Sequence, residues 1–414
     1  MLPDKQCTSD PMPTGLFKQV ADVLEPFLVE LFNRSVSEGL VPSVFKAAYV
    51  TPLLKKADLD SADAKSYRPI SNLSVLSKLL ERLVAQQLID YLRGAGLLPD
   101  LQSAYRAFHS TETAVLKVMS DILWAIDNGN LSLLALLDLS SAFDTVDHEI
   151  LLRRLEASYG LRGTALSWFT SYLNGRMWFI RCRASRSNPA LLGCGVPQGS
   201  VLGPILFVLY TADLVRLIEN FGLHPHLYAD DTQVYGFVVP TQAVHLQQQM
   251  SSCIDSVAEW LRSNRLQLNA AKTEFLWSSS GRRVDQVPSV PIRAGTDSIS
   301  PASSVRNLGI YLDSNISMTT HVSKTVSSCF AALRQIRSVK RSVTRPVLLS
   351  LVQSLVLTRL DYGNATLAGL SGRLTARLQP VLHAAARLIY SKRKYEHITP
   401  LLSELHWLSV PERI

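Results

Sequence analysis

Apolar residues recur at helical spacing over several long stretches of this sequence. The clearest case is residues 77–96, where Leu80, Val84 and Leu88 fall on one face of an amphipathic helix that two glycines end. Another helix is expected to begin at Thr111, which can cap it. The same spacing predicts helices over 16–39, from about Asp147 onward, over 204–221, over 246–269 and, in a basic segment, from Ser317 onward.

A different pattern marks the strands. Residues 131–137 are almost continuously apolar and fit a strand buried on both faces, whereas residues 226–238 (HLYADDTQVYGFV) read as two strands joined by a tight turn. Further strands are expected within 45–58, 179–184, 272–280, 287–295, 297–305 and, as one strong strand, 305–313. Helical, mixed and helical segments follow one another, which predicts an α+β fold with an antiparallel sheet packed on helices.

The composition of the chain indicates which class of partner it could bind. The chain has 414 residues, 47% of them hydrophobic and 18% charged, so it is long enough for two or three folded lobes. Its formal net charge of +8 makes a polyanionic partner plausible.

Cysteine usage and the absence of targeting signals indicate in which cellular compartment the protein is expected. The five cysteines are scattered and never in a C-x-x-C spacing, and they are interpreted as reduced thiols: Cys7, Cys182, Cys194, Cys253 and Cys329. The first residues lack a signal-peptide pattern, and no apolar run is long enough to cross a membrane. We expect an intracellular protein of the nucleus or cytoplasm, neither secreted nor bound to membrane, with no dedicated protein partner evident.

Three aspartates carry the candidate chemistry. Asp138 ends the apolar strand, and Asp230 and Asp231 lie together between two strand-like runs. An acidic pair in a turn is by itself most often only solvated. If the two strand ends are neighbours in one sheet, however, three carboxylates converge, and divalent cations are the natural counter-charge. Oxygen ligands favour Mg²⁺ over zinc, and two such ions can promote an in-line displacement at phosphorus.

Two further features lie between these aspartates. In residues 195–204 (GVPQGSVLGP) closely spaced glycines allow a ligand to approach the backbone, and Gln198 can hydrogen-bond it. Phe143, five positions after Asp138, would stand over the same cleft. Read alone, the first is a turn before a helix and the second a core aromatic.

In this order, ALLDLSSAFDTVDH, GVPQGSVLGPILFVLYTADL and LYADDTQVY resemble the catalytic segments of reverse transcriptases, most closely those of non-LTR (LINE-type) retrotransposons. TPLLKKAD, YRPISNLSVLSKLLERLVAQQL and LLPDLQSAYRAFHSTETAVL are similar to that family's finger segments, and VRNLGIYLD to its primer-gripping strand. The likeness covers nearly the whole chain, and the ordered set of motifs is highly specific.

The resemblance implies a right-hand RNA-directed DNA polymerase that extends a DNA primer with dNTPs on an RNA template. It implies a helical leader (1–40), fingers (41–130), a palm (131–313) and a helical thumb, C-terminally truncated (314–414). Two Mg²⁺ ions, for which Mn²⁺ could substitute, would be held by Asp138, Asp230 and Asp231 and by the carbonyl of Leu139. Asp230 would face the metals more directly than Asp231.

Further roles also follow from the resemblance alone. Phe143 would be the steric gate against a ribose 2′-hydroxyl, and Arg106 would clamp the triphosphate. Gln198 and Gly199 would support the nascent base pair, and Lys272 would protonate the pyrophosphate. The resemblance further implies contacts of Lys55 and Lys56 with the template backbone or the triphosphate, and of the basic thumb helices with the template–primer duplex.

Other interpretations remain open. A zinc hydrolase would use His224, His226 and Asp230, but the sequence offers no clear general base and leaves Asp138 unexplained. An RNA-templated RNA polymerase would use the same carboxylates to hold its metal ions, although Phe143 and YADD favour dNTPs. Because no endonuclease precedes the fingers and the chain stops at SVPERI, we also consider a truncated or catalytically silent, retroelement-derived RNA-binding protein.

Overall fold

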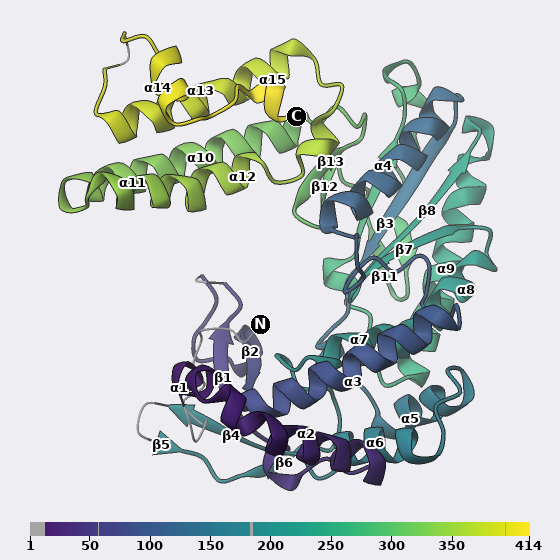
Figure 1. Ribbon diagram of the computed structural model, residues 1–414. Helices are drawn as coiled ribbons and strands as arrows, with labels where there is room; N and C mark the ends of the chain where they lie inside the picture. Colours follow the sequence, from purple (N-terminus) through teal and green to yellow (C-terminus); the bar gives the residue numbers. More distant parts are fainter. Residues whose placement is uncertain (1–12, 57, 183–184, 394) are drawn as a thin grey trace. The chain divides into compact units, whose positions relative to one another are not determined.

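The computed structural model describes residues 13–56, 58–182, 185–393 and 395–414 (Figure 1). Cys7, the first twelve residues of the expected leader and residues 183–184 of one expected strand lie outside these ranges. The chain forms two compact units that alternate along the sequence. Unit 1 contains Met1–Tyr105, Leu139–Leu217 and Ser256–Asn269, and unit 2 contains Arg106–Asp138, Ile218–Asp255 and Ala270–Ile414.

Unit 2 is built on a four-stranded antiparallel sheet. Its strands lie in the order β7 (His224–Tyr228), β8 (Asp231–Val238), β3 (Leu131–Leu137) and β9 (Glu274–Ser278). The predicted strand over 131–137 is confirmed, and Leu131, Leu133 and Leu134 in it are fully buried. The predicted hairpin over 226–238 is confirmed as β7 and β8.

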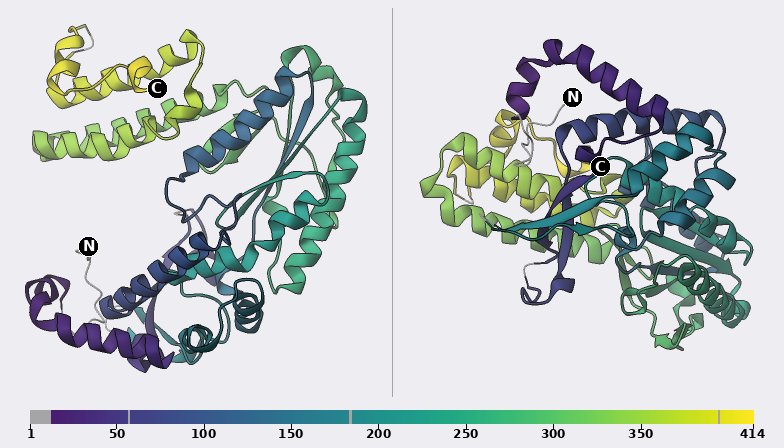
Figure 2. Two further views of the ribbon diagram at one scale, coloured as in Figure 1. Left: turned by 45° about the vertical axis from the view of Figure 1, so that its right-hand side comes forward. Right: turned by 90° about the horizontal axis from the view of Figure 1, so that it is seen from below.

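Two helices cover the opposite faces of this sheet, as Figures 1 and 2 show for α4 (Thr111–Asp127) and α9 (Ala243–Ser263). On the α4 side the Tyr235 hydroxyl donates a 2.6 Å hydrogen bond to Asp121. On the α9 side Gly236 leaves room for Leu246, because a Cβ at Gly236 would come within 2.7 Å of that side chain. Helices therefore pack on both faces of this sheet.

The remainder of unit 2 is helical, apart from two hairpins. One hairpin pairs β10 (Ile292–Ala294) with β11 (Asp297–Ile299). The single strand expected over 305–313 is wrong: Leu308 (φ 45°) and Gly309 (φ 92°) make a two-residue turn that splits it into β12 (Ser304–Asn307) and β13 (Ile310–Asp313). The helices that follow are α10 (Thr319–Val339), α11 (Arg345–Val352), α12 (Thr358–Leu360), α13 (Gly372–Tyr390), α14 (Thr399–Glu404) and α15 (Val410–Arg413).

These helices share one apolar core with the sheet. Leu134 of β3 and Tyr235 of β8 belong to the same buried cluster as Val305 of β12, Cys329 of α10 and Val381 of α13. The helices after residue 318 are therefore packed into unit 2 by burial of apolar surface.

Unit 1 combines helices with a mixed sheet. Its strands are β2 (Tyr67–Asn72), β1 (Ala47–Leu54), β4 (Met177–Cys182), β5 (Ser185–Arg186) and β6 (Ala190–Leu191), and β1 pairs with β4 in parallel. Its helices are α1 (Thr14–Gln19), α2 (Ala21–Glu38), α3 (Val75–Gly94), α5 (His148–Ala157), α6 (Gly163–Leu173), α7 (Leu202–Thr211), the greater part of α8 (Asp213–Glu219) and the C-terminal part of α9, from Ser256 onward.

Three details of the predicted helices are wrong. Thr111 does not cap α4: the Ser110 side chain accepts from the Thr113 backbone N–H at 3.1 Å and forms the capping box. The helix expected over 16–39 breaks at Val20, whose ψ of 15° is not helical. The helix expected over 204–221 is two helices, α7 and α8, that meet at Ala212.

The α+β class with an antiparallel sheet packed on helices is confirmed. Within the described ranges, none of the helices has the length and apolarity that crossing a bilayer requires.

Candidate active site

Four polar side chains form a row at one end of the unit 2 sheet, across the ends of its strands. Leu137 pairs with Thr232 across β3 and β8, so the next positions along the ladder, Asp138 and Asp231, are opposite each other. Asp231 also pairs with Tyr228 of β7. Since side chains alternate along a strand and cross-strand partners share a face, Asp138 and Asp231 lie on the same face of the sheet.

The fourth member of this row is Lys272. Leu136 pairs with Glu274, so the residue two positions before Glu274 falls opposite Asp138. The contact is direct: Lys272 Nζ lies 3.1 Å from Asp138 Oδ2. We call Tyr228, Asp231, Asp138 and Lys272 the carboxylate row.

Asp230 sits next to this row, at the tip of the β7–β8 hairpin. Tyr228 pairs with Asp231, so only Ala229 and Asp230 make the turn. Ala229 has a φ of 55°, a left-handed conformation that costs an alanine free energy. The strained turn keeps the two adjacent carboxylates at the end of the sheet.

The electrostatics of the row show an excess of negative charge. The pKa of Asp231 is raised to about 6, mainly by burial and then by the negative charges of Asp230 and Asp138, with Lys272 acting in the opposite direction. The Asp231 side chain nevertheless remains open to solvent at the hairpin end. A group with this pKa is poised to exchange its proton for a cation near neutral pH.

The chemistry of the donors suits a hard divalent cation, because Asp138, Asp230 and Asp231 offer carboxylate oxygens whose charge is only partly balanced by Lys272. In the described part of the chain, no three or more His, Cys, Asp or Glu side chains, the three aspartates of this site included, are grouped so that they could hold a metal ion as they stand. The ammonium group of Lys272 supplies the counter-charge on Asp138 in this arrangement.

The remaining predicted residues, Arg106 apart, lie in unit 1. Phe143 is half-buried and stacks on Phe207, with ring centroids 4.6 Å apart. Its carbonyl oxygen accepts a 2.8 Å hydrogen bond from the Val196 N–H. The ring is thus fixed through both its side chain and its backbone.

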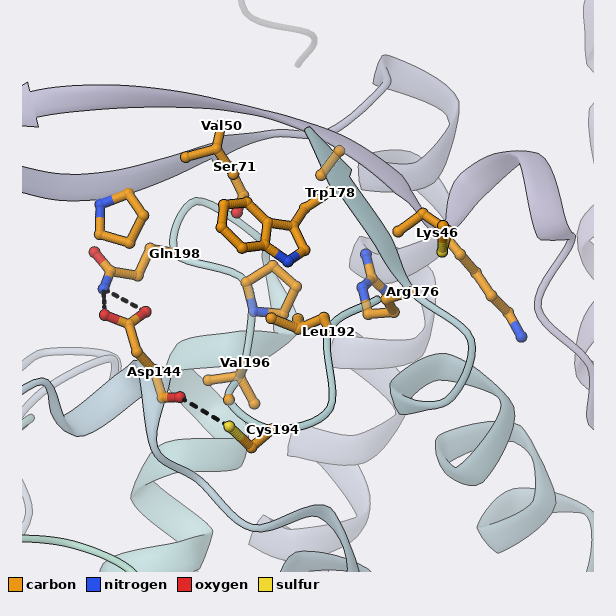
Figure 3. Close-up of a pocket in the computed structure, with 15 residues that line it drawn as sticks. Lys46, Val50, Ser71, Asp144, Arg176, Trp178, Leu192, Cys194, Val196 and Gln198 are labelled. Carbon is orange, nitrogen blue, oxygen red and sulfur yellow. Dashed lines mark hydrogen bonds between the residues drawn. The ribbon is translucent and has the colours of Figure 1, made fainter. Parts of the chain in front are cut away.

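Gln198 is oriented by a carboxylate that the sequence reasoning missed. Its Nε2 donates to both carboxylate oxygens of Asp144, at 2.8 and 2.9 Å (Figure 3). Burial raises the pKa of Asp144, against the opposing effects of the Gln198 hydrogen bonds and the Lys55 charge. Because a carboxylate only accepts, this pair fixes which end of the amide is its oxygen.

The Gly195–Ser200 segment, here called the PQG loop, is held at both ends. Gln198 carbonyl oxygen accepts from the Ser71 N–H at 2.7 Å, and Gly199 (φ 108°) lies so close that a Cβ there would be 2.7 Å from the Ser71 carbonyl oxygen. Downstream, Glu81 Oε2 accepts from the N–H groups of Val201 and Leu202 at 2.7 and 3.1 Å. That carboxylate satisfies the start of α7.

The last predicted residues are placed as follows. Lys55 follows β1 and is exposed, with its Nζ donating to the Lys65 carbonyl oxygen at 2.8 Å, and Lys56 beside it is exposed too. Leu139 forms an isolated antiparallel bridge with Leu268. Arg106 is half-buried in the loop before α4.

The histidines of the zinc alternative have other surroundings. His224 stacks on Tyr235 at 5.5 Å. His226 is buried, and its pKa is lowered to about 4, mainly by burial and then by the charge of Lys117, against the opposing charge of Asp121. Neither histidine belongs to a group of three or more His, Cys, Asp or Glu side chains among the described residues that could hold a metal ion.

Two residues that hold parts of the candidate site in place went unnoticed in the sequence, and each had a signal. Asp144 directly follows Phe143 in the segment SAFDTVDH. Glu81 falls on the apolar stripe of its helix with Leu80, Val84 and Leu88, where a charge requires a partner.

Comparison with known proteins identifies this constellation. Residues 54–312 match the family described as reverse transcriptase (RNA-dependent DNA polymerase), which is more than half of the chain. The chain belongs to the reverse transcriptase family. Membership confirms the predicted resemblance and, with it, the fold class of the right-hand polymerases.

Its curated relatives include RNA-directed DNA polymerases of non-LTR retrotransposons. The chain is 30% identical over 317 residues to the probable RNA-directed DNA polymerase from transposon BS of Drosophila melanogaster, covering 75% of this chain and 34% of the relative. It is 25% identical over 397 residues to the probable RNA-directed DNA polymerase from transposon X-element of the same species, covering 94% and 42%. The chain therefore spans about a third to two fifths of the length of these relatives.

Among solved structures, apo telomerase from Candida tropicalis truncated from its C-terminal domain has a TM-score of 0.47 and 11% identity, covering 66% of this chain and 54% of that one. The apo telomerase of the same species gives a TM-score of 0.45 and 11% identity, covering 94% and 71%.

Proposed function

We propose that this chain carries out RNA-directed DNA synthesis, transferring nucleotides from dNTPs to a primer 3′-hydroxyl on an RNA template. The observation that supports this most strongly is the carboxylate row. In it Asp138 and Asp231 oppose each other, beside Asp230, at one end of the sheet. Membership in the reverse transcriptase family supports the same reaction.

The metal site follows from the same residues. Asp138, Asp230 and Asp231, with the carbonyl oxygen of Leu139, would hold two Mg²⁺ ions, for which Mn²⁺ could substitute. When bound, such ions lower the pKa of an attacking hydroxyl and stabilise the leaving pyrophosphate. Asp230, at the hairpin tip, is proposed as the more direct ligand of the adjacent pair.

The chain's own groups would supply the rest of the chemistry. The ammonium of Lys272 is the proton donor proposed for the departing pyrophosphate, and its contact with Asp138 supports a position at the reacting groups. The Phe143 ring, locked by Phe207, would exclude the ribose 2′-hydroxyl and so select dNTPs.

Substrate positioning is assigned to the PQG loop and to three cations. Gln198, oriented by Asp144, and Gly199 would support the nascent base pair. Arg106 would clamp the triphosphate, and Lys55 and Lys56 would contact the triphosphate or the template backbone. Basic thumb helices would attract a template–primer duplex through its phosphates.

The predicted division into leader (1–40), fingers (41–130), palm (131–313) and thumb (314–414) is proposed as the functional organisation, and the nucleus or cytoplasm as the compartment.

Primer extension on a primed RNA template tests the proposal. We expect wild-type chain with Mg²⁺ and dNTPs to extend the primer, and Asp230→Asn to lower the rate by about 10³-fold or more. Asp285→Asn, the same change at an exposed position of unit 2, serves as the control and keeps the wild-type rate. Equal extension by wild type and Asp230→Asn would refute the assignment.

The second candidate, an RNA-binding protein without catalysis, rests on the positive net charge. It would replace the polymerase if no extension occurred while the chain still bound RNA with a steep salt dependence.

A further inference from the structure

Tyr362 links three segments of unit 2, and none of the roles above uses it. Its hydroxyl donates a 2.6 Å hydrogen bond to the carbonyl oxygen of Leu308, in the turn between β12 and β13. The same phenol oxygen lies 3.1 Å from Oγ1 of Thr111, in the first turn of α4, and can accept a hydrogen bond from that hydroxyl. Because Tyr362 itself follows α12, one side chain joins a hairpin turn, the start of one helix and the end of another.

The turn that Tyr362 contacts is strained and closely packed. Leu308 has a φ of 45°, a left-handed conformation that costs a leucine free energy. At the next residue, Gly309, a Cβ would stand 2.9 Å from Cε1 of Tyr362, so the tyrosine ring packs directly on the backbone of the turn. The hydroxyl and the ring of one residue thus hold two consecutive residues of a strained turn.

This turn lies next to the carboxylate row. Asn307, the residue before it, donates a 2.7 Å hydrogen bond to the side chain of Gln233, and both residues are buried. Gln233 is two residues after Asp231 on the same face of β8, about 7 Å along the strand. Burial and, after it, the neighbouring Tyr362 raise the pKa of Tyr228, another member of the row. A nucleotide bound at the carboxylate row would therefore lie beside the turn.

The turn also offers hydrogen-bond donors. The β12–β13 ladder ends at the pair of Asn307 and Ile310, and neither Leu308 nor Gly309 donates a backbone hydrogen bond to any described residue. Backbone N–H groups are among the donors that contact the phosphates of nucleic acids. Tyr362 meanwhile occupies the carbonyl oxygen of Leu308, an acceptor that would repel a phosphate.

We propose that Tyr362 is a positioning residue for the primer, which holds the Leu308–Gly309 turn in place beside the carboxylate row. This inference rests on the proposed polymerase function. The predicted primer-gripping role of residues 305–313 comes from the family resemblance, whereas the residue that holds this segment comes from the contacts of Tyr362. Since Tyr362 acts only through the turn, its hydroxyl should matter for the primer and not for the incoming nucleotide.

Steady-state primer extension by Tyr362→Phe tests this role, because the substitution keeps the ring and removes only the hydroxyl. The KM for primed template should rise about tenfold, the loss expected for one hydrogen bond, while the KM for dNTP stays at the wild-type value. A smaller amount of folded protein would lower the apparent kcat and change neither KM. An equal rise in both KM values would assign Tyr362 a general structural role and overturn the inference.

Tyr91→Phe is the matched control. Tyr91 is 44% exposed and Tyr362 40%, and the Tyr91 hydroxyl also donates to a backbone carbonyl, that of Tyr159 in unit 1, at 2.8 Å. The control therefore loses a comparable hydrogen bond far from the turn in sequence. Tyr91→Phe should keep the wild-type KM for both substrates.

Hydrogen exchange of the free chain tests the hold on the turn without any turnover. The amides of residues 307–311 should exchange severalfold faster in Tyr362→Phe than in wild type, and at the wild-type rate in Tyr91→Phe. If wild type extends primers, an unchanged KM for primed template or unchanged exchange in Tyr362→Phe would each overturn the inference alone. No extension by wild type would instead refute the proposed function, and this inference with it.

Discussion

The ammonium nitrogen of Lys272 lies 3.1 Å from Oδ2 of Asp138, so the row that carries the acidic groups also carries its own counter-charge. The two residues are 134 positions apart in sequence and meet only because β3 and β9 pair side by side. The contact is partly exposed, which makes it a weak source of stability and a strong influence on charge at the site.

This contact predicts two separable effects of Lys272→Met. Loss of the positive charge should leave the carboxylates more negative, so half-saturation with Mg²⁺ in primer extension should occur at a severalfold lower concentration. The rate at saturating Mg²⁺ should fall by about 10²-fold, the contribution of a general acid. Lys272→Arg should keep the wild-type Mg²⁺ dependence, and Lys324→Met on α10 should change neither quantity. An unchanged Mg²⁺ dependence in Lys272→Met would contradict the first effect.

The raised pKa of Asp231 predicts a pH-dependent stability. The folded pKa of about 6 lies above the ordinary value of 3.8, so the folded state binds the proton more tightly than the unfolded chain does. Stability from the neutral carboxyl is therefore complete below pH 3.8 and is lost as the pH rises through about 6.

Asp231→Asn should remove this loss of stability at higher pH. In metal-free buffer its thermal midpoint should exceed that of wild type above pH 6, and the difference should shrink toward pH 4. Asp285→Asn, at an exposed position, should follow wild type at every pH. A difference between Asp231→Asn and wild type that does not vary with pH would refute the pKa assignment.

The stack of Phe143 on Phe207 predicts a change in sugar selection. Phe143→Ala should raise the ratio of rNTP to dNTP incorporation by about 10²-fold, because the ring is the group proposed to crowd the 2′-hydroxyl. Phe207→Leu loosens the ring without removing it and should give a smaller change. Single-nucleotide incorporation kinetics measure both, and an unchanged ratio in Phe143→Ala would eliminate the gate.

The close approach of Gly199 to Ser71 predicts that the PQG loop does not tolerate a side chain at this position. A Cβ at Gly199 would stand 2.7 Å from the Ser71 carbonyl oxygen, on a residue with a φ of 108°. Gly199→Ala should lower the free energy of unfolding by about 2 kcal/mol or more. Gly193→Ala is the matched control in the same segment, since a Cβ there meets nothing within 4 Å. Urea denaturation compares the two, and equal effects would argue against the steric account.

Glu81 is expected to hold the start of α7 in place. It is 2% exposed, and its carboxylate accepts from the N–H groups of Val201 and Leu202. Glu81→Gln should destabilise unit 1 by about 3 kcal/mol, because Arg176 loses its nearby negative charge and α7 a charged acceptor. Glu156→Gln, exposed on α5, should have almost no effect.

The double variant Glu81→Leu/Arg176→Met tests the physical origin of this loss. Replacing both buried charges with apolar side chains should recover part of the stability, as the high cost of desolvating a buried ion pair implies. A double variant less stable than Glu81→Gln would show that the hydrogen bonds to α7 dominate over the charge pair.

Local sequence patterns were sufficient where a short segment determines its own conformation. The apolar run over 131–137 could be buried only as an interior strand, and the acidic pair between β-prone runs could only be a hairpin end. Local preference failed at Leu308, because a non-glycine residue with positive φ gives no strong signal in the sequence.

For the candidate site, the sequence by itself determined the members: Asp138, Asp230 and Asp231, in segments specific to the reverse transcriptase family. Only the tertiary structure decided their neighbours, placing Asp231 opposite Asp138, Lys272 on Asp138 and Asp144 on Gln198. The physical reason is that the identity of a residue is local, whereas strand register and the pairing of charges are set by packing among segments more than fifty residues apart.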